Sequence, residues 1–211
     1  MKNSKRQIAA FGFAGLLVAM APAFAQGTGS TGTHTGSGGH TGMADAHART
    51  GSSGKLSGAD RTFVMKAAEG GMAEVELGRL AASKATDPDV KAFGQRMVDD
   101  HTKANDKLKA IASEEGITLP TELKGEAKSM HDKLSKASGA DFDKMYMKHM
   151  VTDHKKDVAE FEKESKNGKD SDVKQFASDT LPTLREHLQM AQTTATKVGA
   201  MTSHASTKKG S

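Results

Sequence analysis

The sequence predicts an all-α protein whose one folded domain is a bundle of four long helices. Four long segments repeat apolar side chains every three or four residues, which is the spacing of one helix face. Each segment opens with residues that favour a helix N-terminus. No segment has the alternation of apolar and polar side chains expected of a strand. We expect the four helices at residues 59–84, 87–116, 138–167 and 170–198.

Capping signals bound the first two helices. Ser57-Gly58-Ala59-Asp60 resembles a capping box, and Asp87-Pro88-Asp89 provides an N-cap followed by the proline that suits the first helical turn. Gly116 is a typical C-terminal stop. Inside the first helix, three glycines each cost up to about 1 kcal/mol relative to alanine, a cost that is explained if another helix approaches closely there. These glycines are Gly70, Gly71 and Gly78.

The chain between the second and third helices is long enough to return along the whole bundle. We expect a short helix within it, from Glu122 to Lys136. Such a crossover allows the third helix to run parallel to the second. Four long helices joined in this way have the connectivity of a ferritin-like antiparallel four-helix bundle. Pro182 is expected to kink the fourth helix, because the carbonyl four residues earlier loses its hydrogen-bond donor.

The first 25 residues are typical of an export signal peptide. Three basic residues precede an apolar run, and Ala23-Phe24-Ala25 is a small-x-small cleavage site. The run is short for a membrane span and no second run follows. We therefore expect an exported mature chain without a transmembrane segment, in the periplasm or associated with the outer membrane. Residues 26–58, rich in Gly, Ser, Thr and His, predict a disordered linker, and residues 199–211 predict a flexible tail.

The amino-acid composition excludes several kinds of function. The signal segment contributes three of the 30 Lys and Arg residues and none of the 26 Asp and Glu residues, so the mature chain has a net charge of only +1. This balance gives no electrostatic footprint for nucleic acid. The chain has no cysteine, which excludes disulfides, thiolate metal sites and thiol catalysis. No phosphate-binding loop or nucleophile motif is present.

One polar residue interrupts the apolar face of each long helix. Each of the four lies within about three residues of its helix midpoint, which corresponds to roughly 5 Å along the axis. They are therefore expected to form one polar layer in the middle of the bundle. The third helix also carries His149 at the edge of its apolar face, and we interpret it as an i,i+4 surface pair with Asp153. The layer residues are Glu74, His101, His154 and His187.

Three imidazoles and a carboxylate make a suitable ligand set for one transition-metal ion. Zinc, iron, manganese and copper all accept such donors, and bundle cores commonly hold them. Tyr146 lies two turns before His154 and Asp100 is adjacent to His101, so both are candidates to orient the imidazoles from outside the ligand set. A metal-free alternative stays open, in which the same side chains satisfy one another and fix the helix register as a hydrogen-bond network.

Four segments together resemble a family of exported bacterial ferritin-like bundles of unknown function, whose members are often labelled as predicted outer-membrane proteins. The resemblance covers about residues 60–196 and implies the bundle fold and export. It implies no particular activity. The segments are Glu69-Gly70-Gly71-Met72-Ala73-Glu74-Val75-Glu76-Leu77-Gly78, Met97-Val98-Asp99-Asp100-His101, Phe142-Asp143-x-x-Tyr146 with His154, and Leu181-Pro182-x-Leu184-x-x-His187.

The sequence lacks the ligand pattern of true ferritins and di-iron enzymes. Those proteins use Glu-x-x-His on two helices, but Val98, Val151 and Leu184 stand three residues before the histidines. Ferroxidase chemistry is therefore disfavoured, and we expect no enzymatic activity. We predict a non-catalytic bundle that binds a single transition-metal ion. The alternative is a metal-free structural or interaction module of the cell envelope, with an envelope protein or a second copy of the chain as partner.

Overall fold

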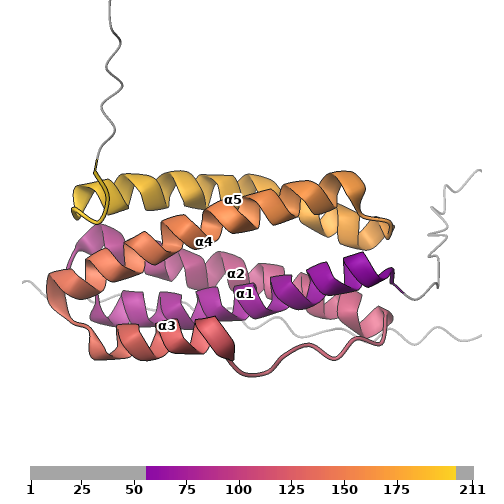
Figure 1. The fold of residues 1–211 in the computed structure, drawn as a ribbon, viewed down its shortest axis with the longest axis horizontal. Coiled ribbons are helices and arrows are strands. Elements are labelled where there is room, and N and C mark those ends of the chain that lie inside the picture. Colours follow the sequence, from indigo (N-terminus) through magenta and orange to yellow (C-terminus); the bar gives the residue numbers. More distant parts are fainter. Residues whose placement is uncertain (1–55, 203–211) are drawn as a thin grey trace, which may run out of the picture. The chain divides into compact units, whose positions relative to one another are not determined.

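A computed structural model describes residues 56–202 and contains five helices over that range (Figure 1). The described range holds no strand, so the predicted all-α class is confirmed. The predicted export signal at residues 1–25, most of the linker predicted at 26–58, and the end of the tail predicted at 199–211 lie outside the described residues. The helices are α1 (Gly58–Lys84), α2 (Pro88–Glu114), α3 (Gly125–Lys136), α4 (Gly139–Asn167) and α5 (Ser171–Lys197).

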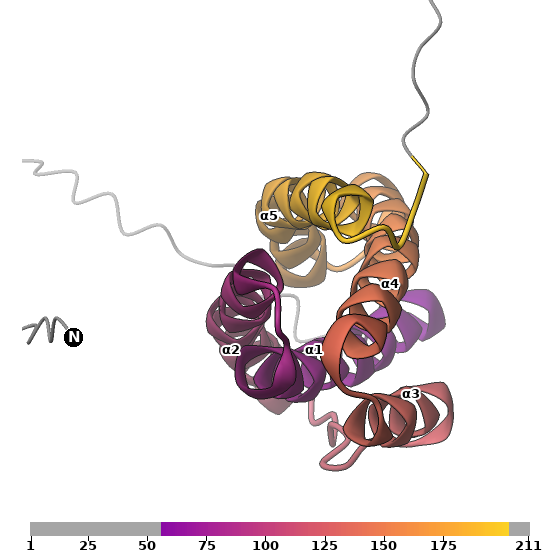
Figure 2. The same cartoon turned by 90° about the vertical axis from the view of Figure 1, so that its left-hand side faces the viewer.

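The four long helices pair as two hairpins, α1 with α2 and α4 with α5 (Figures 1 and 2). Lys197 at the end of α5 contacts Asp89 at the start of α2, with 2.6 Å between Nζ and Oδ2. Lys66, early in α1, contacts Glu160, late in α4, at 3.3 Å. These ion pairs show that α5 is antiparallel to α2 and that α4 is antiparallel to α1. Because adjacent helices all run antiparallel, α2 and α4 are parallel to each other and lie across the diagonal.

The turn of each hairpin is held by an aspartate from the other hairpin. Asp143, near the start of α4, accepts hydrogen bonds from the backbone N–H groups of residues 86–87 at 3.0 and 2.9 Å. Asp60, near the start of α1, accepts hydrogen bonds from the N–H groups of residues 169–170 at 3.1 and 3.0 Å. Both aspartates are buried. The two hairpins are therefore joined at both ends of the bundle by buried carboxylates.

The two hairpins also repeat a sequence pattern. Asp-x-Asp-Val-Lys-x-Phe occurs at residues 87–93 and again at residues 170–176. In both copies the first aspartate caps the helix by accepting a hydrogen bond from the N–H group two residues later, at 2.8 and 3.0 Å. The phenylalanine that ends the pattern is buried in both. The same local signals therefore start α2 and α5.

The connection from α2 to α4 runs back beside α1 and includes the short helix α3 (Figure 1). Lys84, at the end of α1, donates hydrogen bonds to the carbonyls of Leu134 and Ser135, at the end of α3. The helix begins three residues later than predicted, because Lys124 is extended and Gly125 has a φ of 52°, which favours glycine. The buried side chain of Leu134 attaches α3 to the core.

Two expectations from the sequence concern Pro182 in α5 and the presence of membrane-spanning helices. α5 continues through Pro182 as one helix from residue 171 to residue 197. Proline removes one backbone donor from the helix, and Leu181 and Leu184 on either side of it are buried in the core. None of the helices in residues 56–202 combines the length and hydropathy needed to cross a membrane.

α1 and α2 approach each other closely at two glycines. A β-carbon added to Gly78 would lie 2.7 Å from the carbonyl oxygen of Gly94, and one added to Gly94 would lie 2.6 Å from the β-carbon of Ala81. Gly71 is crowded by a side chain of α2. The predicted role in close helix approach is therefore confirmed for Gly78. It is wrong for Gly70, where an added β-carbon would meet nothing within 4 Å.

The apolar core consists of two clusters, one on each side of the predicted polar layer. On α2, Met97 belongs to one cluster and Leu108 to the other, with His101 between them. The layer residues of the other long helices are flanked by the two clusters in the same way. All four layer residues are buried, with exposed fractions between 0% and 7%. The polar layer therefore divides the core into two apolar halves.

Both ends of the described range pack against the bundle. Leu56, which the sequence assigns to the linker, is buried and belongs to one of the two apolar clusters. Ala200 and Met201, which the sequence assigns to the tail, contact the other cluster. Gly199, with a φ of 70°, turns the chain so that the N–H of Ala200 bonds to the carbonyl of Ala195 at 2.8 Å. These contacts extend the folded region slightly at both ends.

The glycine at the contact between α1 and α2 gives a direct test of this packing. We expect Gly78→Ala to lower the free energy of unfolding by about 2 kcal/mol or more, because the added methyl group meets backbone that cannot move aside. The matched change Gly70→Ala should leave it unchanged or raise it by up to about 1 kcal/mol, through helix propensity. Urea denaturation followed by circular dichroism measures both. Equal effects of the two changes would contradict the close approach.

Candidate metal centre

Three histidines from three helices converge in the middle of the bundle. His101 lies on α2, His154 on α4 and His187 on α5. Each offers a ring nitrogen, and the three nitrogens lie within 4.8 Å of one another. The ring centroids are 5.8, 5.5 and 5.4 Å apart. The fold therefore brings three of the four predicted layer residues together as one group.

The protonation of His154 is fixed by its own helix. Its Nδ1 lies 3.0 Å from the carbonyl oxygen of Met150, one turn earlier. A carbonyl oxygen only accepts, so Nδ1 carries the proton and donates it. The other ring nitrogen, Nε2, then holds a lone pair, and it is buried with no hydrogen-bond partner among the described residues. His154 can therefore bind a cation through the lone pair on Nε2.

His187 is oriented in the same manner by a carboxylate. Its Nε2 donates to Oδ2 of Asp100 at 3.0 Å, so Nδ1 holds the lone pair, and Nδ1 is buried without a hydrogen-bond partner in the described range. Arg96 contacts the same Asp100 oxygen at 3.0 Å and Glu186 at 3.0 Å. Burial acts to raise the pKa of Asp100, but the hydrogen bonds from His187 and Arg96 outweigh it and leave the pKa below its usual value. The sequence places Asp100 beside His101 as an orienting residue, and the structure shows that it orients His187.

His101 completes the group. The residue is 7% exposed, and its Nε2 is buried with no hydrogen-bond partner within residues 56–202. Three unpartnered imidazole nitrogens thus come from three buried rings. The lone pairs of His154 and His187 cannot hydrogen-bond to each other, and an unsatisfied buried nitrogen costs free energy. A cation bound to all three would remove that cost.

Burial keeps the imidazoles neutral. Desolvation, reinforced by His154 and His187, lowers the pKa of His101 to about 3. Desolvation, reinforced by His187, also lowers the pKa of His154 to about 3. Burial lowers the pKa of His187 as well, against the opposing effect of Asp100. At neutral pH the three rings are therefore in the form that binds metal.

Glu74, the fourth predicted layer residue, lies beside His154 but outside the three-histidine group. Its Oε1 is 3.6 Å from Nδ1 of His154, the nitrogen that donates to Met150. Glu74 therefore approaches the nitrogen that carries the proton, and not the unpartnered Nε2. Tyr146, predicted to orient His154, forms no hydrogen bond with it in the described range, and its buried hydroxyl has no partner. Burial, and then the charge of Glu74, raise the pKa of Tyr146.

Sequence reasoning missed two carboxylates that join Glu74. Glu74, Asp153 and Asp157 each offer an oxygen atom within 4.8 Å of the other two. Burial and the neighbouring Asp153 raise the pKa of Glu74 well above its usual value, and the same two causes raise the pKa of Asp157 to about 8. The surface pair of Asp153 with His149 that the sequence predicts forms no ion pair in the described part of the chain. The sequence does contain a signal for this group. Asp153 and Asp157 are four residues apart, on one face of their helix, at the same depth in the bundle as Glu74.

Fold and site together define a small helical-bundle protein with three buried histidines at its centre. The chain belongs to the family described as a domain of unknown function, DUF4142, whose model matches residues 45–194. The matched range includes the three histidines and the group around Glu74. The expected resemblance to a family of unknown function is confirmed at this level. No curated protein matches the chain.

Two solved structures share the fold. A DUF305 fragment from Deinococcus radiodurans superposes with a TM-score of 0.60 at 12% identity, covering 70% of this chain and 100% of that chain. A DUF305 protein from Streptomyces coelicolor, described as a predicted secreted protein, superposes with a TM-score of 0.59 at 12% identity, covering 69% and 97%. At this identity the likeness shows the fold alone.

The depressed histidine pKa values predict how the stability of metal-free protein depends on pH. In the unfolded chain His101 takes up a proton near pH 6.5, whereas in the folded protein it does so only near pH 3. The unfolded state therefore binds more protons between these values, and lowering the pH through them costs about 1.4 kcal/mol per pH unit. The variant His101→Gln lacks this titrating group. The free energy of unfolding of the wild type minus that of the variant should therefore fall by about 1.4 kcal/mol for each pH unit below 6.5. Denaturation at several pH values measures it, and a constant difference would contradict the prediction.

Proposed function

We propose that this protein binds a single transition-metal ion through His101, His154 and His187 and holds it without catalysis. The observation that supports this most directly is that three buried histidines from three helices each offer a ring nitrogen within 4.8 Å of the other two. Each of them also has a buried ring nitrogen without a hydrogen-bond partner among the described residues. Two of the three rings have their other nitrogen occupied by a hydrogen bond that leaves the lone pair free. Metal-binding histidines are typically oriented in this way by carbonyl or carboxylate groups.

The donor atoms favour particular metals. Imidazole nitrogens suit zinc, copper and iron, whereas manganese prefers oxygen ligands. Because Glu74 faces the protonated nitrogen of His154, a nitrogen-only set of three protein ligands fits the geometry better than the four-residue set predicted from the sequence. A non-catalytic role fits the burial of the three rings, whose exposed fractions do not exceed 7%. A substrate would need an open path to the ion.

The wider setting of the proposal is an exported, ferritin-like protein of the periplasm or outer membrane. Residues 1–25 have the pattern of an export signal, and the fold relative from Streptomyces coelicolor is described as a predicted secreted protein. The parallel helices α2 and α4, joined by a connection that returns along the bundle, support the ferritin-like crossover.

Elemental analysis and zinc titration of the mature protein test the proposal. We expect one Zn²⁺ per chain for wild type and none for the double variant His101→Ala/His154→Ala. A matched control is His131→Ala, which removes a histidine of α3 outside the group and should leave binding unchanged. Zn²⁺ at about 100 times its Kd should raise the free energy of unfolding by about 2.7 kcal/mol, because it binds only the folded state.

Two results would overturn the proposal. One is a wild-type protein that binds no zinc, copper or iron. The other is a melting temperature indifferent both to these ions and to a chelator. Either result would favour the metal-free alternative, in which the polar layer sets the helix register of an interaction module.

Asp100, which accepts a hydrogen bond from His187, provides a second prediction, about the strength of metal binding. We expect Asp100→Asn to weaken Zn²⁺ binding by about tenfold or more, because the loss of charge makes the His187 ring a poorer donor and loosens its orientation. The neighbouring change Asp99→Asn removes the same charge from an exposed side chain that does not contact the histidines, and it should have little effect. Competition titration with a chromogenic chelator measures both. Equal weakening in the two variants would show that only overall charge matters.

A further inference from the structure

A second group of potential ligands lies beside His154. We propose that Glu74, Asp153 and Asp157 bind a hard divalent cation, of the class of Mn²⁺ and Mg²⁺, at a site distinct from the three histidines. One oxygen atom of each residue lies within 4.8 Å of the others, close enough for a single ion to contact all three. The two groups share no residue.

The burial of Glu74 is the observation that points to a ligand. Its side chain is 1% exposed, and neither carboxylate oxygen has a hydrogen-bond partner among residues 56–202. Buried carboxylates are normally paired with a cation or with several hydrogen-bond donors. Nδ1 of His154 is 3.6 Å from Glu74 Oε1 and already donates to Met150. A positive ion would satisfy the carboxylate that the protein leaves unpaired.

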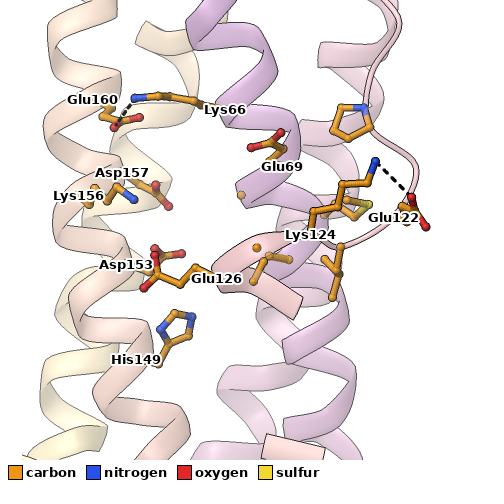
Figure 3. A pocket seen from close by; sticks show the side chains of 17 residues that line it. Lys66, Glu69, Glu122, Lys124, Glu126, His149, Asp153, Lys156, Asp157 and Glu160 are labelled. Carbon is orange, nitrogen blue, oxygen red and sulfur yellow. Dashed lines mark hydrogen bonds and ion pairs between the residues drawn. The ribbon is translucent and has the colours of Figure 1, made fainter. Parts of the chain in front are cut away.

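A surface pocket connects this group to solvent. Asp153 and Asp157 are half-buried and line a pocket of about 380 Å³ formed by α1, α4 and the chain leading into α3 (Figure 3). Six carboxylates and three lysines line the pocket, so it is acidic overall. Two of the lysines are paired within it, Lys66 with Glu160 and Lys124 with Glu122. The pocket therefore attracts cations and leads them to the two aspartates.

The donor atoms set the class of ion. All three ligands are carboxylate oxygens, which suit Mg²⁺, Ca²⁺ and Mn²⁺, whereas the histidine group suits zinc or copper. Solvent from the pocket can supply the remaining ligands that a hard cation requires. Two metal sites would thus lie on either side of His154, one with oxygen ligands for hard cations and the other with nitrogen ligands for zinc or copper.

Manganese titration by electron paramagnetic resonance tests the second site. The mature chain is stripped with chelator, given one equivalent of Zn²⁺, and titrated with Mn²⁺, whose free-ion signal disappears on binding. We expect one Mn²⁺ per chain, and about tenfold or greater weakening in Asp157→Asn and in Asp153→Asn, since each removes one of three charged ligands. Circular dichroism confirms that both near-isosteric variants are folded.

Two control variants make the result specific. Glu69→Gln removes an exposed carboxylate of the same pocket that is outside the ligand group, and it should bind Mn²⁺ as wild type does. His101→Gln, titrated with Mn²⁺ without added Zn²⁺, disables the histidine group and should also keep Mn²⁺ binding, even if that group binds no metal at all. The proposal is overturned if wild type binds no Mn²⁺, if Glu69→Gln weakens binding as much as Asp157→Asn, or if His101→Gln abolishes binding.

Discussion

The structure depends on how a layer of polar groups is accommodated in the middle of an apolar core. Three imidazoles and a carboxylate separate two apolar clusters, and each of the four long helices contributes to both. Two of the imidazoles have a defined protonation because one nitrogen of each donates to a fixed acceptor. Burying the remaining nitrogens without a hydrogen-bond partner among the described residues costs free energy. A bound cation, as proposed above, would offset that cost.

The layer also separates two kinds of donor. The other two histidines lie on one side of His154 and the carboxylate group of Glu74, Asp153 and Asp157 lies on the other. The His154 ring is therefore next to both groups. The proton on its Nδ1 lies between the two. Burial raises the pKa of Glu74 and so favours its neutral form, whereas a cation bound beside it, as proposed above, would favour the ionised form next to that proton. Occupancy of one group is thus expected to influence the other through His154.

Much of this arrangement could be predicted from the sequence. Apolar periodicity and caps place the helices, and helix midpoints place Glu74, His101, His154 and His187 at one depth. Which side chains meet within the layer could not be predicted, because one residue corresponds to a rotation of 100° and the crossing angles set the rest. For this reason Asp100 orients His187 and not its neighbour His101, and Glu74 meets two aspartates of α4. Asp153 could not be assigned to this group from the sequence, because a surface pair with His149 explained its i,i+4 spacing equally well.

The aspartates at the hairpin turns have a consequence for folding. Asp60 and Asp143 each satisfy backbone donors of the hairpin to which they do not belong. A hairpin formed alone would therefore lack these contacts, and its turn N–H groups and its aspartate would face water instead. Each half becomes complete only when the other docks. The bundle should accordingly fold and unfold as one cooperative unit, and neither hairpin should persist as a stable intermediate.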